Sequence, residues 1–451
     1  MLCKGTTYPY QDKVIWFLRE IISPNMTAAG SSSSVTPNVL SDIVRVCWGT
    51  NVKEDIFVRW TQGFQFSVDE PTALVQYEGG PCAVLAPTQA FILKFIVENI
   101  DPRTDDWRQI EPEDQNKLLA HAIVEMLKQA VDTTTFHIVY IDETESASND
   151  LSFDQFHSQL KVHSCASCNE VEEFYYQRIA LLHNRFGVLL FLYSVLYSKG
   201  LARLRLEVSD ITEPLIDREF GYGSQSLINL MITGRAVNYV FDHVQDIDGL
   251  QLQGINQQSQ IGFLTLLEHL RYCEVGSYLK NPINPVWVLG SETHLTVSFS
   301  FEKRLASLES CADKARRMFK MFDPDGNNFI AGDHLQNLLA KLDLVSDIHY
   351  VDIMRKKLDP DELGIILLSA FMDEFFGEPE KLPPDTFDIF HYNGLARSNY
   401  ERKVMYRMAH AVLLECNINC LLETNPMLTC LQTKWPSIEL NWTHGVTPSL
   451  N

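Results

Sequence analysis

The sequence lacks the features that place a protein in a membrane or outside the cell. Its most apolar run, at residues 188–196, is well short of the roughly 18 residues that a membrane-spanning helix needs. The apolar stretch at residues 14–22 is interrupted by Arg19 and Glu20 and leads to no cleavage site, so we expect no signal peptide. Ten cysteines at irregular spacing form no disulfide framework. We therefore expect free thiols in a reducing compartment, the nucleus or the cytoplasm, and no membrane partner.

Basic residues are also in short supply. The 37 Lys and Arg residues face 58 Asp and Glu residues, which gives a formal net charge of −21 at pH 7. Because such a charge repels a phosphate backbone, we expect no nucleic-acid partner. A composition with 45% hydrophobic and 21% charged residues is ordinary for a folded protein, and 451 residues are too many for one ordinary core. We expect two or three packed units.

Composition divides the first two thirds of the chain. Residues 1–40 include the Ser-rich stretch Thr27–Asn38 and are predicted to be a flexible N-terminal extension. A dense apolar pattern predicts a globular core over residues 41–305. Within it, residues 142–172 are rich in Ser, Asp and Glu and poor in large apolar side chains, so we predict an exposed insertion there.

The last third changes character twice. Residues 306–379 carry the pattern of a helix–loop–helix unit that occurs two times. Residues 380–451 are mixed and end in a stretch that contains Trp435 and Trp442. We predict that this C-terminal part returns to the core and that the helical unit is an insertion.

Local patterns predict both helices and strands. Apolar residues at helical spacing predict helices over residues 113–130 and Gln225–Thr233, the second capped by Ser224. Val286–Leu289 reads as a short strand, and strict alternation of apolar and polar residues predicts a strand over His294–Phe301. The predicted fold class is α+β.

One cysteine stands where a reactive thiol would be placed. Cys82 follows the sharp loop Gly79-Gly80-Pro81 and opens an apolar segment with helical spacing. At a helix N-terminus, the helix dipole favours the thiolate form that attacks a carbonyl. Pro87 predicts a kink in this helix or a later start of its regular part. The alternative is that Cys82 is a buried structural cysteine.

Two further residues could complete a thiol hydrolase. Gln76 precedes Cys82 by six residues, and its side-chain amide could donate to an oxyanion; the alternative is an amide that stabilises the loop. His294 heads a predicted strand and could present a base to a cleft; the alternative is a surface histidine. The order of glutamine, cysteine and a late histidine is that of papain-like enzymes.

Several stretches of the sequence resemble the MINDY family of deubiquitinases. The similarity extends from about residue 41 to Asn451 and is greatest to the longer branch of the family, which carries an EF-hand-like segment. The stretches that carry the resemblance are Gln76–Val84, Pro214–Asp217, Gly221–Asn229, Val275–Lys280, Gly290–Val297 and Cys430–Pro436.

The resemblance implies a papain-like cysteine protease core with an inserted EF-hand-like helical unit. It implies that Cys82 is the nucleophile, His294 the proton acceptor and Gln76 the oxyanion-stabilising residue. The implied reaction is hydrolysis of the isopeptide bond after the C-terminal Gly-Gly of ubiquitin, with a preference for lysine-48-linked chains. The implied partners are ubiquitin, polyubiquitin chains and ubiquitinated proteins. No third catalytic residue can be read from the sequence, and Thr296 and Glu302 are both candidates to orient the histidine.

The helix–loop–helix pair resembles two EF-hands with incomplete calcium loops. Residues 323–334 offer oxygen ligands at the first, third and fifth positions, but the sixth position is Asn328 instead of Gly and the twelfth is His334 instead of a bidentate Glu. A weaker copy begins at Asp359 and has Ala370 at its twelfth position. We therefore predict a structural role for the pair and expect no metal or other cofactor.

Two alternatives to an enzyme remain open at this stage. One is a catalytically inert scaffold that binds ubiquitin, and the other is a calcium-responsive adaptor built around the helix–loop–helix pair. A zinc site at Cys165 and Cys168, with His157 and His163 nearby, is also conceivable, but no second Cys-x-x-Cys pair follows and an incidental pair is the preferred interpretation.

Overall fold

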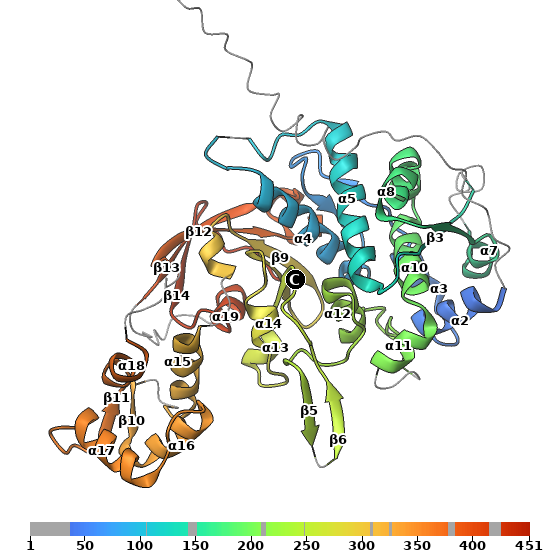
Figure 1. The fold of residues 1–451 in the computed structure, drawn as a ribbon. Helices are drawn as coiled ribbons and strands as arrows, with labels where there is room; N and C mark the ends of the chain where they lie inside the picture. Colours follow the sequence, from blue (N-terminus) through green and yellow to red (C-terminus); the bar gives the residue numbers. More distant parts are fainter. Residues whose placement is uncertain are drawn as a thin grey trace, which may run out of the picture.

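A six-stranded sheet forms the centre of the fold (Figure 1). Its strand order is β14–β13–β12–β9–β8–β7, and every neighbouring pair is antiparallel except β7 and β8, which run parallel. The strands of this sheet are β7 Gly262–Thr265, β8 Val286–Gly290, β9 Leu295–Phe299, β12 Thr386–Tyr392, β13 Arg407–Leu413 and β14 Ile438–Trp442. The remaining strands form two-stranded pairs: β1 Gln65–Phe66 with β2 Leu74–Val75, β3 Phe136–Tyr140 with β4 Lys161–Cys165, β5 Val244–Ile247 with β6 Leu250–Gln253, and β10 Phe329–Ala331 with β11 Ile365–Leu367.

Helices make up most of the rest of the protein. The computed structural model describes residues 37–104, 106–142, 151–208, 213–247, 249–306, 310–323, 327–377, 384–414 and 425–451. The helices are α2 Pro37–Trp48, α3 Glu54–Trp60, α4 Cys82–Asn99, α5 Pro112–Ala130, α7 Phe153–Ser158, α8 Cys168–Gln177, α9 Ala180–His183, α10 Gly187–Lys199, α11 Leu201–Glu207, α12 Gln225–Thr233, α13 Leu266–His269, α14 Ser277–Lys280, α15 Cys311–Met321, α16 Leu335–Lys341, α17 Ile348–Leu358, α18 Leu368–Phe376 and α19 Pro426–Gln432. Short 3-10 helices lie at Lys303–Ala306, Gly332–His334, Ala396–Ser398 and Tyr400–Arg402.

Each face of the central sheet packs against its own hydrophobic cluster. On one face, α4 contacts β8 and β9, and α5 and α12 in turn pack on α4. Val297 and Phe299 of β9 belong to this larger cluster. On the other face, α13 and α19 cover β7, β8 and β14, and the ring of Trp435 meets that of Trp287 edge to face at 5.2 Å. Burial of both faces fixes the register of the strands.

The local predictions of helices and strands agree with the structure. The helix predicted over residues 113–130 is α5, and the helix predicted over Gln225–Thr233 is α12, whose Ser224 hydroxyl accepts a hydrogen bond from the N–H of Leu227. The two predicted strands are β8 and β9, and the α+β class is confirmed. The polar residues of β9 are buried as well. The Ser298 hydroxyl donates to the main-chain oxygen of Phe390 on β12 at 2.8 Å and so joins the two strands.

Residues 151–172 of the predicted exposed insertion over residues 142–172 lie mostly at the surface but are anchored in the fold. These residues form α7, β4 and the start of α8, and β4 pairs with β3 along its whole length. Phe156 and Val171 are fully buried. The many Ser, Asp and Glu residues obscured a few large apolar side chains that suffice to anchor these elements. Residues 143–150 lie outside the described residues.

Helix α2 begins at Pro37, inside the predicted extension, and Val39 and Leu40 already pack on the core. Residues 1–36 lie outside the described residues. Strands β12, β13 and β14 come from the C-terminal part of the chain and complete the sheet that β7, β8 and β9 begin. The chain therefore enters the central sheet, leaves it for α15 to α18, and returns.

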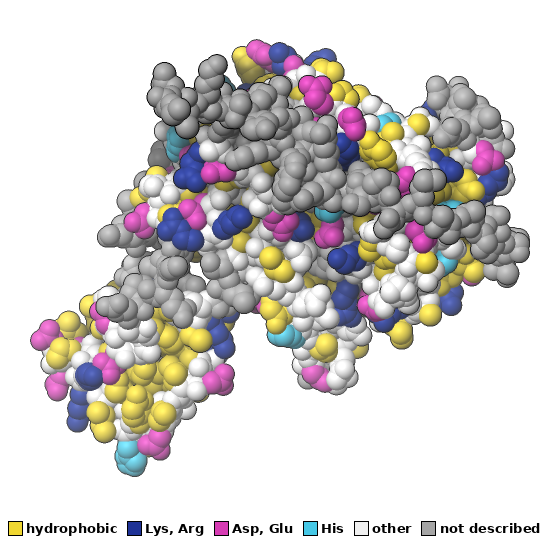
Figure 2. All heavy atoms as spheres, turned by 45° about the horizontal axis from the view of Figure 1, so that its top comes forward, with side chains coloured by type: hydrophobic (Ala, Val, Ile, Leu, Met, Phe, Trp, Pro, Cys, Tyr) yellow, Lys and Arg dark blue, Asp and Glu magenta, His cyan; other side chains and the backbone are white. Residues whose placement is uncertain are grey.

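Helices α15 to α18 form a lobe with its own core, at the lower left of Figure 1. Phe319, Leu338 and Phe371 are fully buried within it. The lobe contains the predicted helix–loop–helix pattern twice, and β10 and β11 join the two loops. Apolar side chains also gather on its outer surface in Figure 2, and the exposed ones include Ile353 and Leu363.

Among the described residues, α4 and the bent pair of α10 and α11 have the length and composition of a membrane span. In α4, 89% of the apolar window is buried inside the fold. The apolar run at residues 188–196 belongs to α10 and is buried too. Both segments are therefore core helices by their packing. Helix α4 is continuous from Cys82, so its regular part does not wait until Pro87.

We expect the free energy of unfolding to fall as the pH drops below about 6.5. Burial lowers the pKa of His157 to about 4 and that of His391 to about 3. Below their usual pKa, both histidines take up protons in the unfolded chain but remain neutral in the folded protein, so protonation favours unfolding. Each histidine should cost about 1.4 kcal/mol per pH unit over this window.

Urea unfolding at about pH 7 and pH 5 tests this expectation, with His157→Gln as the comparison. The variant should lose less stability between the two pH values than the wild type, because it has one histidine fewer to protonate. An equal loss in both proteins would contradict the assignment to His157.

Candidate active site

Cys82 is the first residue of α4 and follows a tight loop directly. Gly80 has a φ of +135°, a conformation that residues with a side chain rarely adopt. A Cβ at Gly80 would also lie 3.0 Å from Nε1 of the buried Trp60. That Nε1–H donates to the main-chain oxygen of Gly221 at 2.8 Å. The loop is thus held against a buried tryptophan, and this contact fixes where α4 begins.

The start of α12 supports the same end of α4. A Cβ on Gly223 would lie only 2.3 Å from the Cβ of Ala83, so a glycine is needed for the two segments to pack this closely. The stretch Gly221–Asn229, one of those that carried the family resemblance, therefore positions the Cys82 helix through packing.

His294 lies in the turn between β8 and β9. The Ser291 hydroxyl accepts from the N–H of His294 at 3.0 Å, and the Ser291 N–H donates to the His294 oxygen at 3.0 Å. The imidazole is only 6% exposed, and its Nε2 lies 3.0 Å from Oδ1 of Asn393. Oδ1 of Asn393 also accepts from the N–H of Leu395 at 2.9 Å. Because this oxygen can only accept, Nε2 of His294 carries the proton and Nδ1 holds the free lone pair.

Cys82 and the His294 strand lie side by side. The main-chain N–H of Leu295, the residue after His294, approaches the Cys82 sulfur, as do the N–H groups of Ala83 and Cys82 itself. These donors favour the thiolate, but burial outweighs them and raises the pKa of Cys82 to about 11. Burial also lowers the pKa of His294, and the nearby charge of Arg397 lowers it further against the opposing effect of Asn393.

At pH 7 the Cys82 thiol and the His294 imidazole are therefore both neutral. The sequence placed Cys82 correctly at a helix N-terminus. Only 4% of the residue is exposed, and this desolvation raises the pKa of Cys82 by more than the three main-chain N–H groups lower it.

Gln76 approaches from the other side of the loop. Its main-chain N–H donates to the oxygen of Gly394 at 2.8 Å, so the Gln76 segment runs beside the end of β12. Its side chain is 2% exposed, and Nε2 donates to the oxygen of Glu78 at 2.9 Å. Gln62 binds the same loop through Glu78 and Tyr77. In the unliganded protein the Gln76 amide therefore stabilises the loop.

The sequence as a whole now identifies the family. The chain matches the family model described as "Deubiquitinating enzyme MINDY-3/4, conserved domain" over residues 45–323. The chain belongs to the MINDY-3/4 family of deubiquitinating enzymes. It is 43% identical to the human ubiquitin carboxyl-terminal hydrolase MINDY-3, over 91% of this chain and 99% of that protein. It is 44% identical to the Drosophila melanogaster MINDY-3 homolog, over 91% of this chain and 83% of that protein.

A more distant relative is the probable ubiquitin carboxyl-terminal hydrolase MINDY-4 of Mus musculus, which is 32% identical over 56% of this chain and 35% of that protein. No solved structure matches the chain. The resemblance seen in the sequence is confirmed, and this MINDY-3/4 family member is a ubiquitin hydrolase. The inert scaffold is therefore no longer needed to explain the sequence.

Asn393 is the residue that sequence analysis of this MINDY-3/4 family member missed. Neither of the two residues considered as an orienter bonds the histidine. The Thr296 hydroxyl has no partner among the described residues, and Glu302 pairs with Arg304 at 2.8 Å. Asn393 lies 99 residues beyond His294. The only local signal for it is an Asn-Gly turn after a strand, which is too common to identify a functional residue.

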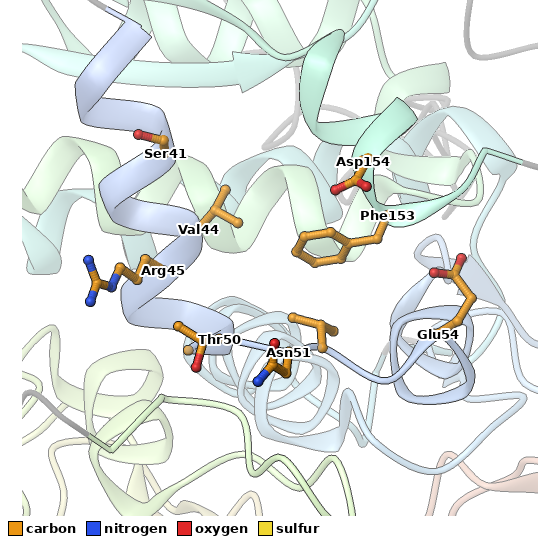
Figure 3. Close-up of a pocket in the computed structure, with 10 residues that line it drawn as sticks. Ser41, Val44, Arg45, Thr50, Asn51, Glu54, Phe153 and Asp154 are labelled. Carbon is orange, nitrogen blue, oxygen red and sulfur yellow. The ribbon is translucent and has the colours of Figure 1, made fainter.

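A pocket of about 650 Å³ lies elsewhere, between α2, the start of α3 and α7 (Figure 3). Arg45, Glu54 and Asp154 line it, and none of the residues discussed above does. Among the described residues, no three His, Cys, Asp or Glu side chains lie close enough together to hold a metal ion. Cys165 is buried in β4, and burial raises its pKa to about 12, which disfavours the thiolate that zinc needs.

We expect alkylation of Cys82 by a small haloacetamide to be slow near neutral pH and to accelerate up to about pH 11. The rate should rise about tenfold per pH unit, because only the thiolate reacts. Mass spectrometry of the modified peptides measures it in the unliganded protein. Cys311 is exposed and serves as the internal reference. A rate for Cys82 that is already constant below pH 8 would show a preformed thiolate and contradict this expectation.

Proposed function

We propose that this deubiquitinase uses Cys82 as nucleophile, His294 as general base, Asn393 as the orienter of His294 and Gln76 as an oxyanion donor, in a papain-like core. The observation that carries the proposal is the hydrogen bond from Nε2 of His294 to Asn393, next to a strand whose first N–H approaches the Cys82 sulfur. A cysteine at a helix start, a strand histidine and an asparagine on the histidine form the arrangement of papain-like proteases.

The proposed chemistry follows from which ring nitrogen of His294 carries the proton. With Nε2–H bound to Asn393, Nδ1 of His294 accepts the proton of the Cys82 thiol. The thiolate attacks the carbonyl carbon of the C-terminal glycine of ubiquitin, and the resulting imidazolium protonates the departing lysine amine. A thioester then links ubiquitin to Cys82. Water, deprotonated by His294, cleaves the thioester and releases ubiquitin with a free carboxylate.

The oxyanion of each tetrahedral intermediate needs donors at the start of α4. The main-chain N–H of Cys82 and the side-chain amide of Gln76 are the two groups proposed for this role. Gln76 would have to exchange its bond to Glu78 for one to the substrate. Glycines at 79 and 80 keep the loop narrow, which suits the Gly-Gly end of ubiquitin.

Substrate binding must also open the site. Cys82 and His294 are 4% and 6% exposed, so a peptide carbonyl reaches the sulfur only when neighbouring groups move aside. At the rim beside them, Glu78 and Arg397 are more than half exposed and their charges are 3.9 Å apart. A weak surface pair of this kind costs little to separate.

We further propose that lysine-48-linked chains are the preferred substrates and that the enzyme acts in the nucleus or the cytoplasm on ubiquitinated proteins. The family resemblance supports the linkage preference, and the free cysteines of the described chain support a reducing compartment. The net charge of −21 would attract a basic protein surface.

We propose that the lobe α15–α18 is an EF-hand-like pair with a structural role. Ile330 and Ile366, each the eighth residue of its loop, pair with each other between β10 and β11. The first residue of each loop caps its own main chain: Asp323 accepts from the N–H of Asn328 at 2.7 Å, and Asp359 from that of Gly364 at 2.7 Å. Position three of the first loop, Asp325, lies outside the described residues.

Calorimetric titration of the protein with calcium should show no binding in the micromolar range. The twelfth position of each loop, His334 and Ala370, lacks the bidentate carboxylate that completes the coordination shell. An Ala370→Glu, Leu363→Asp double variant restores two ligands of the second loop and is the positive comparison. Micromolar binding by the wild type would revive the calcium-responsive adaptor.

The proposed active site is tested with ubiquitin that carries a C-terminal thiol-reactive group. Mass spectrometry should find the adduct on Cys82 of the wild type and none on Cys82→Ala. His294→Ala should slow labelling by a factor of about 10² or more, and Gln76→Ala should lower kcat on a fluorogenic ubiquitin amide by about 10²-fold. Asn393→Ala removes one hydrogen bond to an imidazolium, which predicts a loss of roughly 10- to 150-fold.

Two matched variants control for general damage. Cys273→Ala removes a half-buried thiol, and His410→Ala removes an exposed histidine paired with Asp388, so both should label as the wild type does. Folded wild type that binds ubiquitin chains but forms no adduct would refute the assignment of Cys82. A panel of differently linked chains then tests the linkage preference, which fails if lysine-48-linked chains are not cleaved fastest.

A further inference from the structure

The segment Ser449–Asn451 lies against the proposed active site. The side-chain amide of Asn393 donates from Nδ2 to the main-chain oxygen of Ser449 at 3.1 Å and to that of Asn451 at 3.4 Å. Figure 1 shows this end of the chain beside β9. Asn393 itself is only 1% exposed, so these bonds are shielded from water.

We propose that Ser449–Asn451 is a positioning element that locks the amide of Asn393 in the orientation that His294 requires. This inference rests on the proposed function of His294 and Asn393. It concerns a segment that takes no part in the chemistry and touches neither Cys82 nor Gln76 in any described hydrogen bond.

Both ends of the Asn393 side-chain amide are hydrogen-bonded. Oδ1 of Asn393 accepts from His294 and from the N–H of Leu395, and Nδ2 donates to the two oxygens of the segment. If the amide were turned over, Nδ2 would face two donors and Oδ1 would face two acceptors, so all four bonds would be lost at once. Without the segment, only the two bonds at Oδ1 would hold the amide, and His294 would lose part of its orientation.

Further contacts hold the segment in place. Leu450 is 4% exposed and belongs to the hydrophobic cluster that includes Leu289 of β8. The side chain of Asn451 meets the hydroxyl of Ser291, whose other bonds fix the main chain of His294. These contacts anchor the segment beside the turn, and its effect on the His294 ring passes through Asn393.

The test compares the wild type with a chain that ends at Pro448 and with Leu450→Ala, which removes the buried anchor but keeps every main-chain oxygen. Val446→Ala is the matched control, because Val446 is an apolar residue of the same stretch that is 58% exposed. The assay is hydrolysis of a fluorogenic ubiquitin amide, with kcat and KM determined separately. Thermal unfolding confirms that each variant is folded; if the shortened chain does not fold, Leu450→Ala decides.

We expect the shortened chain to lose about tenfold in kcat, the scale for losing two neutral hydrogen bonds, with KM unchanged. Leu450→Ala should lose less, and Val446→Ala should match the wild type. In the Asn393→Ala background, shortening the chain should cost nothing more, because the segment acts through that side chain. A merely structural role would lower kcat by the same factor in both backgrounds.

The Asn393→Asp substitution provides a second test, because its effect on kcat should depend on whether the segment is present. In the intact chain, Asn393→Asp should lower kcat, because a carboxylate would face the oxygens of Ser449 and Asn451 without a proton to share. In the shortened chain the same substitution should restore kcat, since the carboxylate then faces only the imidazolium. No restoration, together with equal losses in both backgrounds, would overturn the proposal, as would a shortened chain more active than the wild type.

These outcomes separate the two proposals. If the wild type forms no ubiquitin adduct at Cys82, or if Asn393→Ala keeps wild-type kcat, the proposed active site is wrong. Suppose that the wild type forms the adduct at Cys82 and that Asn393→Ala loses kcat, but the shortened chain keeps wild-type kcat. The proposed active site is then supported, and the proposed role of Ser449–Asn451 is refuted.

Discussion

The end of β12 is the constraint on which the arrangement of the site depends. Over three residues, this segment contacts parts of the chain that are far apart in sequence. The Tyr392 hydroxyl donates to the oxygen of Leu74 at 2.6 Å, Asn393 binds His294, and the oxygen of Gly394 accepts from Gln76. A Cβ on Gly394 would lie 2.2 Å from the Tyr392 hydroxyl, so only glycine allows the chain to turn there. Both halves of the site are tied to this one strand end.

This arrangement explains why the helical lobe can be an insertion. The chain leaves the sheet after β9 and returns as β12, which pairs with β9 directly. The described residues of the lobe have a separate core, and the hydrogen bonds given above for the site come from other parts of the chain. The site therefore depends on the return of the chain to the sheet, and the lobe between the two strands can differ in its loops without changing the geometry at Cys82.

Burial sets the chemical state of the unliganded site. Desolvation raises the pKa of Cys82 and lowers that of His294, so both groups are neutral, and the same effect keeps the neighbouring His391 uncharged. A second positive charge beside the imidazolium would oppose its formation, so a neutral His391 is compatible with catalysis. In the proposed mechanism, the binding of ubiquitin would offset the cost of forming the ion pair.

The sequence by itself determined the local features: α12 with its Ser224 cap, the alternation in β9, the α+β class and the position of Cys82 at the start of a helix. These features depend on residues within a few positions of one another in sequence, because hydrophobic periodicity and helix capping act over that range. Only the tertiary structure decided that residues 151–172 are anchored in the core, that Asn393 binds His294, and that Ser449–Asn451 holds Asn393. Hydrogen bonds between distant segments leave no periodic signal in the sequence. The desolvation of a group depends on all the residues packed around it. Neither can therefore be predicted from residues that are adjacent in sequence.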